Sequence, residues 1–156
     1  MWGYFIVVYM GKFIFLSSDF YNDYPATEYP EIEQKALRPY IQLLTLIDGI
    51  QYAIPLRSHI THPHVFWTDK QNQCGLDFSK AVVISKQNYI DNTKVPHIRQ
   101  NEFDALRGKD YRIQQKMAKY IADYKKAKTK DDEISQELCR NSTLQYFEEY
   151  IKGESE

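Results

Sequence analysis

Residues 38–57 read RPYIQLLTLIDGIQYAIPLR, in which two apolar segments flank the pair Asp48-Gly49. Asp-Gly is among the residue pairs that accept positive φ angles at both central positions of a type I′ turn, and this turn joins antiparallel strands tightly. The stretch therefore predicts a β-hairpin with strands over 38–47 and 50–57.

The turn also predicts the register of the two strands. If Ile47 pairs with Ile50 and no bulge follows, Arg38 lies opposite His59 at the open end of the hairpin. The residues at this end are therefore expected to lie side by side.

Apolar segments on both sides of the hairpin extend it into a sheet. Residues 13–18 (FIFLSS) predict a buried strand, and the acidic, proline-containing stretch 19–30 predicts a short helical turn and a loop. Residues 58–67 predict a loop leading into a short strand, and residues 81–85 (AVVIS) predict another strand.

The period of the apolar residues changes after Asn101, where spacings of three and four indicate one face of a helix. This face comprises Phe103, Leu106, Asp110, Ile113, Met117, Tyr120, Tyr124 and Ala127. Gly108 is expected to break the helix after a first short turn, and capping patterns at Thr129 and Ser142 predict two further helices. Strands followed by helices predict an α+β fold, a twisted antiparallel sheet with C-terminal helices packed on it.

Length and composition limit the class of protein. A chain of 156 residues with 43% apolar and 26% charged residues predicts one soluble domain over 1–156. The six glycines form no dinucleotide-binding or P-loop motif, so no nucleotide cofactor is expected. The two cysteines form no C-x-x-C pair, and no signal peptide or membrane span is recognised, so we expect a cytoplasmic protein without membrane contact.

Charge is strongly segregated although the net charge is only −1. Residues 107–130 carry nine basic side chains against two acidic ones. Such a block is typical either of a solvated helix face or of a surface that binds nucleic acid. The candidate RNA-binding residues are Lys12, Lys35, Lys109, Tyr111, Arg112, Lys116 and Lys119.

Three of the four histidines fall within residues 59–64, and this cluster allows several interpretations. One is a metal site formed by His62 and His64, with Cys74, Asp69 or His97 as a further ligand. Another is a polar surface loop whose histidines have no catalytic or metal-binding role. A Ser-His-Asp hydrolase based on Ser58 has little support, because no G-x-S-x-G motif surrounds this serine.

A further interpretation is cleavage of RNA without a metal, in which the 2′-hydroxyl of the substrate is the nucleophile. The protein must then accept the proton of that hydroxyl, protonate the leaving 5′-oxygen and stabilise charge on the phosphorane. Histidine can carry either proton, and arginine offers a planar fork to phosphate oxygens. Arg38, Arg57, Ser58 and His59 supply these groups at the open end of the hairpin, which is therefore the candidate catalytic site.

Residues 12–18 (KFIFLSS) and 38–59 (RPYIQLLTLIDGIQYAIPLRSH) together resemble the N-terminal half of type III toxin–antitoxin endoribonucleases. The similarity is to the ToxN/AbiQ-like family, and especially to its CptN-like branch. In that family an opening K-F-x-x-x-S-S strand precedes a hairpin that ends in Y-x-x-P-L-x-S. The resemblance covers roughly residues 12–65, and the basic segment after residue 101 matches only in character.

The resemblance implies a partly barrelled sheet related to the Kid and MazF toxins. It also implies sequence-selective, metal-independent RNA cleavage that leaves a 2′,3′-cyclic phosphate on cellular or phage mRNA. The inhibitor would be a pseudoknotted, repeat-derived RNA antitoxin that the toxin itself processes, in a closed complex where RNA bridges the protomers. A non-catalytic RNA-binding module is the alternative from another functional class.

The family's functional positions are only partly matched. Ser58 falls on the serine that follows P-L-x, whereas Arg57 stands where relatives often carry Thr and Arg38 where they often carry Lys. Ile60 replaces a lysine, and Tyr21 lies beside the position of a frequent tyrosine. The helix tyrosine near the family's active site has no clean counterpart, and Tyr111 is one turn from the nearest position. These departures make His59, with Tyr21 as a second possibility, the candidate proton carrier.

Overall fold

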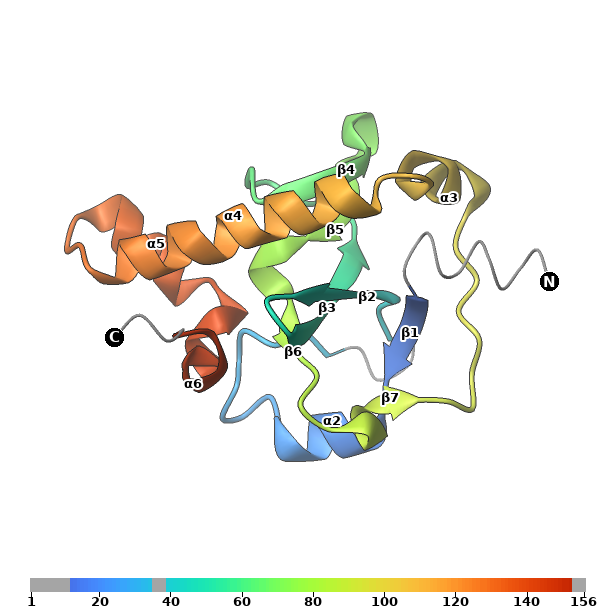
Figure 1. The fold of residues 1–156 in the computed structure, drawn as a ribbon, viewed down its shortest axis with the longest axis horizontal. Helices are drawn as coiled ribbons and strands as arrows, with labels where there is room; N and C mark the ends of the chain where they lie inside the picture. The colour runs from blue at the N-terminus through green and yellow to red at the C-terminus, as the bar shows by residue number, and fades with distance from the viewer. Residues whose placement is uncertain (1–11, 35–38, 153–156) are drawn as a thin grey trace.

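The chain was analysed as a computed structural model, which describes residues 12–34 and 39–152 (Figure 1). A seven-stranded antiparallel sheet has the order β4-β5-β3-β2-β1-β7, with β6 pairing beside β3, and it is not closed into a barrel. The strands are β1 (Lys12–Leu16), β2 (Gln42–Ile47), β3 (Ile50–Arg57), β4 (Val65–Asp69), β5 (Cys74–Asp77), β6 (Val82–Val83) and β7 (Ile90–Asp91). Together with the helices, this sheet confirms the predicted α+β fold.

Most of the helical residues follow the strands in sequence. The α-helices are α2 (Ser18–Asp23), α3 (Gln100–Leu106), α4 (Asp110–Lys128), α5 (Glu133–Arg140) and α6 (Glu148–Ile151). Short 3-10 helices are η1 (Lys70–Asn72), η2 (Phe78–Lys80), η3 (Gln87–Tyr89) and η4 (Thr143–Tyr146). Among the helices within residues 12–34 and 39–152, none has both the length and the apolar character needed to cross a membrane.

The hairpin forms at the predicted turn. Asp48 and Gly49 have φ angles of 51° and 79°, the positive values that a type I′ turn requires. Pairing runs without a bulge from Ile47 and Ile50 at the turn to the last pair, Gln42 with Pro55. The register inferred from the turn is therefore confirmed for these strands. The predicted pairing of Arg38 with His59 involves a residue outside the described part of the chain.

Strand β3 changes its second neighbour along its length, and Pro55 lies at the change. Residues 52–53 pair with β6, whereas residues 56–57 pair with β5. The Leu56 amide donates to the Ile41 carbonyl at 2.8 Å, so the neighbouring Pro55 position directs its nitrogen away from β2. A proline there removes no hydrogen bond to β2. The end of β3 is thereby free to join β5, which brings Arg57 beside Gly75.

Strands β5 and β7 were not anticipated from the sequence. The four residues of β5, Cys-Gly-Leu-Asp, are all buried, so they show no alternation of apolar and polar residues. Gly75 is required there because a Cβ at this position would clash with the Phe66 backbone and lie 2.8 Å from Val65 Cγ1. The strand is therefore defined by close packing against β4 rather than by local preference.

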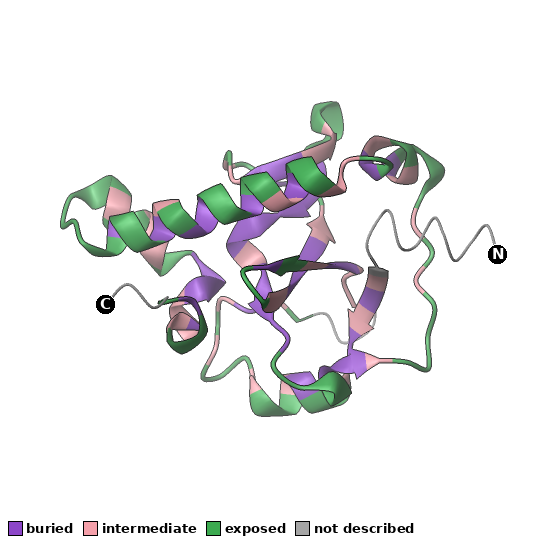
Figure 2. Ribbon diagram, in the orientation of Figure 1, coloured by how far each residue is buried: buried purple, intermediate pink, exposed green. Residues whose placement is uncertain are grey.

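The predicted helix after Asn101 is confirmed, including its interruption. Gly108 has a φ of 75° and separates α3 from α4. The buried side of α4 consists of Ile113, Met117, Tyr120, Ile121, Tyr124 and Ala127 (Figure 2). Asp110, the polar exception on this side, is partly desolvated, and this burial raises its pKa to about 6.

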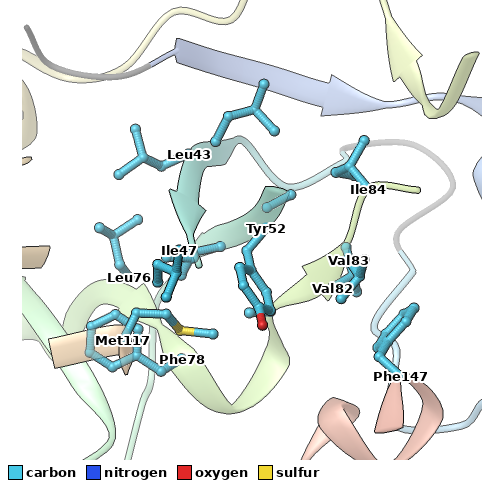
Figure 3. Packing of buried hydrophobic residues seen from close by; sticks show 14 of the residues in the cluster. Leu43, Ile47, Tyr52, Leu76, Phe78, Val82, Val83, Ile84, Met117 and Phe147 are labelled. Carbon is cyan, nitrogen blue, oxygen red and sulfur yellow. The ribbon is translucent and has the colours of Figure 1, made fainter. Parts of the chain in front are cut away.

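A single cluster of buried side chains extends from Ile14 to Ile151. Its centre joins Tyr52 of β3 and Leu76 of β5 to Met117 of α4 (Figure 3). Leu56 and Arg57 at the end of β3 are only partly buried, so this end of the strand lies at the margin of the core. The candidate site lies at that margin.

Candidate functional site

A cavity of about 490 Å³ opens where β3 ends. Four parts of the described chain supply its walls: β1, the residues around the end of the hairpin, the segment 94–99, and α3, to which that segment leads. Figure 1 shows the segment 94–99 on the stretch of chain that runs along the side of the molecule from β7 to α3. The lining residues are Phe15, Pro39, Tyr40, Ile41, Leu56, Arg57, Ser58, Lys94, His97, Ile98, Arg99 and Glu102.

The charged residues of the cavity favour an anionic ligand. Arg57, Lys94 and Arg99 are cationic, and Glu102 is the one acidic residue among the lining. Glu102 is buried, accepts a hydrogen bond from the Thr68 hydroxyl at 3.2 Å and lies 3.6 Å from Arg99 Nε. The Arg99 side chain remains 73% exposed, so it can still contact a ligand.

Arg57 is held by two carboxylates. Its Nη1 donates to Asp77 Oδ2, and its Nη2 lies 3.0 Å from Glu33 Oε1. Burial disfavours the charge on Arg57, but Asp77 and then Glu33 outweigh this and raise the pKa of the guanidinium. Arg57 therefore keeps its charge and has a fixed position beside the cavity.

Asp77 is fully buried and accepts several hydrogen bonds. Its Oδ1 accepts from the Ser79 amide at 3.0 Å and the Ser79 hydroxyl at 2.6 Å, and it lies 3.0 Å from His62 Nε2. Burial alone would raise the pKa of Asp77, but His62, Ser79 and Arg57 together hold it below its ordinary value. The result is a buried carboxylate that stays ionised and anchors Arg57.

Ser79, His62 and Asp77 lie together, yet they do not form a hydrolase triad. In a triad the serine and the carboxylate bond to opposite nitrogens of the histidine. Here both Ser79 Oγ and Asp77 Oδ1 lie within 3.2 Å of the same nitrogen, Nε2. The other nitrogen, Nδ1, accepts the His64 amide hydrogen bond at 3.0 Å, so it cannot act as a base.

The metal interpretation of the histidine cluster finds no support in the geometry. The rings of His62 and His64 are 5.5 Å apart, and both nitrogens of His62 already have partners. Within the part of the chain that the structure describes, no three His, Cys, Asp or Glu side chains are grouped so that they could hold a metal ion. Burial and the neighbouring His62 also lower the pKa of His64.

Only some of the predicted catalytic residues line the cavity. Arg57 and Ser58 both line the cavity, and Ser58 is exposed. His59 is also exposed, but its φ of 59° turns the chain at this point, and it is not among the lining residues. Tyr21 is partly buried in α2, where burial and then Tyr40 raise its pKa to about 12. Such a tyrosine is a proton donor at neutral pH rather than a base.

His97 is a histidine of the cavity lining that the sequence did not assign to catalysis. From the sequence, His97 is only a possible further metal ligand, and it lies 38 residues after His59, outside the histidine cluster. The structure brings its segment next to Ser58 and Arg57 as walls of one cavity. The nearby Lys94 and Arg99 are the sequence signal that could have indicated an anion-binding segment.

The candidate RNA-binding residues of α4 are mostly on its surface. Tyr111 is 70% exposed, and Arg112, Lys116 and Lys119 are exposed as well, while Lys109 is half-buried. Lys119 is paired with Asp123 at 2.8 Å. Lys116 and Lys119 also line a smaller cavity of about 130 Å³ together with His64. Only the backbone of Lys12 is described, in β1, and Lys35 lies outside the described residues.

Comparisons with known proteins found no matching family model, no matching curated protein and no matching solved structure.

Proposed function

We propose that this chain is a metal-independent endoribonuclease toxin of a type III toxin–antitoxin system, acting in the cytoplasm. In its reaction the RNA 2′-hydroxyl attacks the adjacent phosphate, the bond from phosphorus to the 5′-oxygen of the next nucleotide breaks, and the products are a 2′,3′-cyclic phosphate and a 5′-hydroxyl. A pseudoknotted RNA antitoxin, processed by the toxin, is the proposed inhibitor and bridges protomers in the inactive complex. The supporting observation is the cavity that combines Arg57, Ser58, His97 and Arg99.

Each of these side chains has a role in the proposed reaction. His97 carries a proton to or from the reacting oxygens, and the Ser58 hydroxyl orients a phosphate oxygen or the 2′-hydroxyl. Lys94 and Arg99 neutralise the phosphate, and Arg57, anchored by Asp77, stabilises the phosphorane. Because Asp77 fixes Arg57 before RNA binds, little reorganisation is needed during the reaction.

The alternative function is RNA binding without cleavage. One observation favours it: both terminal nitrogens of Arg57 already contact carboxylates, Asp77 and Glu33. An arginine occupied in this way would hold the loop in place without stabilising a transition state. The two functions differ in whether RNA is cut, which makes them separable by experiment.

The test is to induce the chain in a bacterium that lacks its antitoxin RNA, and to incubate purified protein with RNA in excess chelator. Growth arrest, together with cleavage that yields cyclic phosphate ends, supports the proposal. Unaffected growth and intact but bound RNA indicate the binding module. Cleavage that the chelator stops contradicts the metal-independent mechanism.

A further inference from the structure

The two carboxylates that hold Arg57 differ in their exposure to solvent. Asp77 has a side chain that is 0% exposed, whereas the Glu33 side chain is 35% exposed. Asp77 also has Ser79 and His62 as partners, so its position does not depend on Arg57 alone. Asp77 therefore stays bonded to Arg57, whereas Glu33 can separate from Arg57 without any change in the buried core.

Among the residues that the structure describes, the contacts of the Glu33 carboxylate go through one oxygen. Its Oε1 lies 3.0 Å from Arg57 Nη2 and accepts the Tyr40 hydroxyl hydrogen bond, also at 3.0 Å. Both Arg57 and Tyr40 line the cavity, so Glu33 lies directly behind two of its walls. The carboxylate thus occupies a small oxyanion position formed by a guanidinium and a phenol.

The donors of Arg57 are not fully used by Glu33. Nη2 and Nε lie on the same edge of a guanidinium and together form a fork for two oxygens of a carboxylate or phosphate. Arg57 Nε is buried and makes no hydrogen bond within the described residues. Glu33 therefore satisfies one arm of the fork and leaves the other arm without a partner.

We infer that Glu33 stands in for a phosphate in the free protein, and that a phosphate group of RNA displaces it from Arg57 and Tyr40. A phosphate can occupy both arms of the fork and still accept the Tyr40 hydroxyl. Loss of the Glu33 contact costs little, because the Glu33 side chain is partly open to solvent, which weakens its ion pair with Arg57. The identification of the phosphate as RNA rests on the proposed function, whereas the oxyanion site does not.

This arrangement would select against isolated anions. Inorganic phosphate must displace Glu33 with only the local contacts to compensate, while RNA adds further contacts through neighbouring phosphates. Glu33 therefore lowers the affinity for small anions and leaves the site open to a polyanion. Removal of the Glu33 charge should relax this selection.

The test compares Glu33→Gln with Glu31→Gln. Glu31 is two residues away and also belongs to an ion pair, with Lys80 at 2.7 Å, so both variants lose one negative charge. The probes are inorganic phosphate and a 2′-O-methyl oligonucleotide, which cannot be cleaved by 2′-hydroxyl attack. Affinities are measured by calorimetry, and thermal melts verify that both variants are folded.

We expect Glu33→Gln to bind inorganic phosphate about two- to fivefold more tightly than the wild type, the gain that corresponds to a weak ion pair. Glu31→Gln should leave phosphate affinity within error of the wild type. Equal gains in both variants would reduce the effect to net charge and overturn the inference, as would unchanged or weaker binding by Glu33→Gln. If the gain is found but RNA is never cleaved, the oxyanion site stands and the proposed ribonuclease function fails.

Discussion

At the scale of single residues, the buried carboxylate of Asp77 holds the candidate site together, although no catalytic motif surrounds it in the sequence. Asp77 contacts Arg57, His62 and Ser79, and each of these contacts involves a different part of the chain. Removing one member of such a buried set leaves the others with uncompensated charge or unpaired donors. The stability of the candidate site therefore depends on one side chain.

We expect Asp77→Asn to lower the free energy of unfolding by about 3 kcal/mol, because Arg57 loses the buried one of its two counter-charges and keeps only Glu33. Ser79→Ala is the control and should cost less, about 2 kcal/mol, the value of one hydrogen bond to a charged group. Urea denaturation at pH 7 measures both losses. A smaller loss for Asp77→Asn than for Ser79→Ala would show that Asp77 is not the anchor.

The same carboxylate predicts a dependence of stability on pH. The pKa of Asp77 is lower in the folded chain than its ordinary value of 3.8, so the unfolded chain binds more protons in acid. The stabilisation is complete above about pH 4 and is lost as the pH falls through the folded pKa. Urea midpoints measured from pH 6 to pH 2 should fall less steeply for Asp77→Asn than for the wild type.

The proposed reaction predicts that two histidines differ in their effect on the cleavage rate. We expect His97→Ala to reduce the cleavage rate by about 10²–10⁴-fold, the usual effect of losing a proton carrier, without reducing RNA affinity. His59→Ala is the matched control, since His59 is exposed but does not line the cavity. If His59→Ala is inactive and His97→Ala retains full activity, the proton carrier is His59 and not His97.

At the scale of elements, α4 combines a buried side with a basic surface. Its apolar residues pack on the sheet, so the remaining side is open for contact with a partner. Lys116 and Lys125 are nine residues apart, which corresponds to two and a half turns of helix and places them on opposite sides. This pair separates a specific RNA contact from the effect of positive charge in general.

We expect Lys116→Gln to weaken RNA binding and to reduce the slope of log affinity against log salt by about 0.7, the value for one lost contact with a single strand. Lys125→Gln changes the net charge equally but should leave the slope unchanged. Fluorescence anisotropy at several salt concentrations measures both. Identical slopes for the two variants would remove this side of α4 from the interface.

At the scale of the whole molecule, the C-terminal segment is bonded to η2, which follows β5, and to α4. The Thr143 hydroxyl donates to the Ser79 carbonyl at 3.1 Å, and Lys128 lies 3.2 Å from Glu148. Phe147 is completely buried in the cluster that begins at Ile14. The two ends of the described chain thus contribute to one core.

A shared core predicts that the chain unfolds as one unit. Thermal transitions followed by far-ultraviolet and near-ultraviolet circular dichroism should coincide, because loss of the C-terminal packing also exposes the sheet. Deletion of residues 142–156 should abolish the cooperative transition rather than remove one element. Two separate transitions in the full chain would instead indicate independent domains.

The sequence by itself determined the elements whose signals are local. Asp48-Gly49 specified the hairpin and its register, because only certain residues adopt positive φ at both turn positions. The period of the apolar residues and Gly108 likewise predicted α3 and α4. Arg57 and Ser58 could be placed at one end of the hairpin for the same reason, since register follows from the turn.

Only the tertiary structure decided which distant residues complete the site. His97 enters the cavity through a segment without regular structure, and Glu33 and Asp77 reach Arg57 from opposite directions along the chain. Strand β5, which carries Asp77, is fully buried and so has no alternating pattern to reveal it. These contacts depend on long-range packing and on the desolvation that accompanies it, and neither is encoded in the spacing of neighbouring residues.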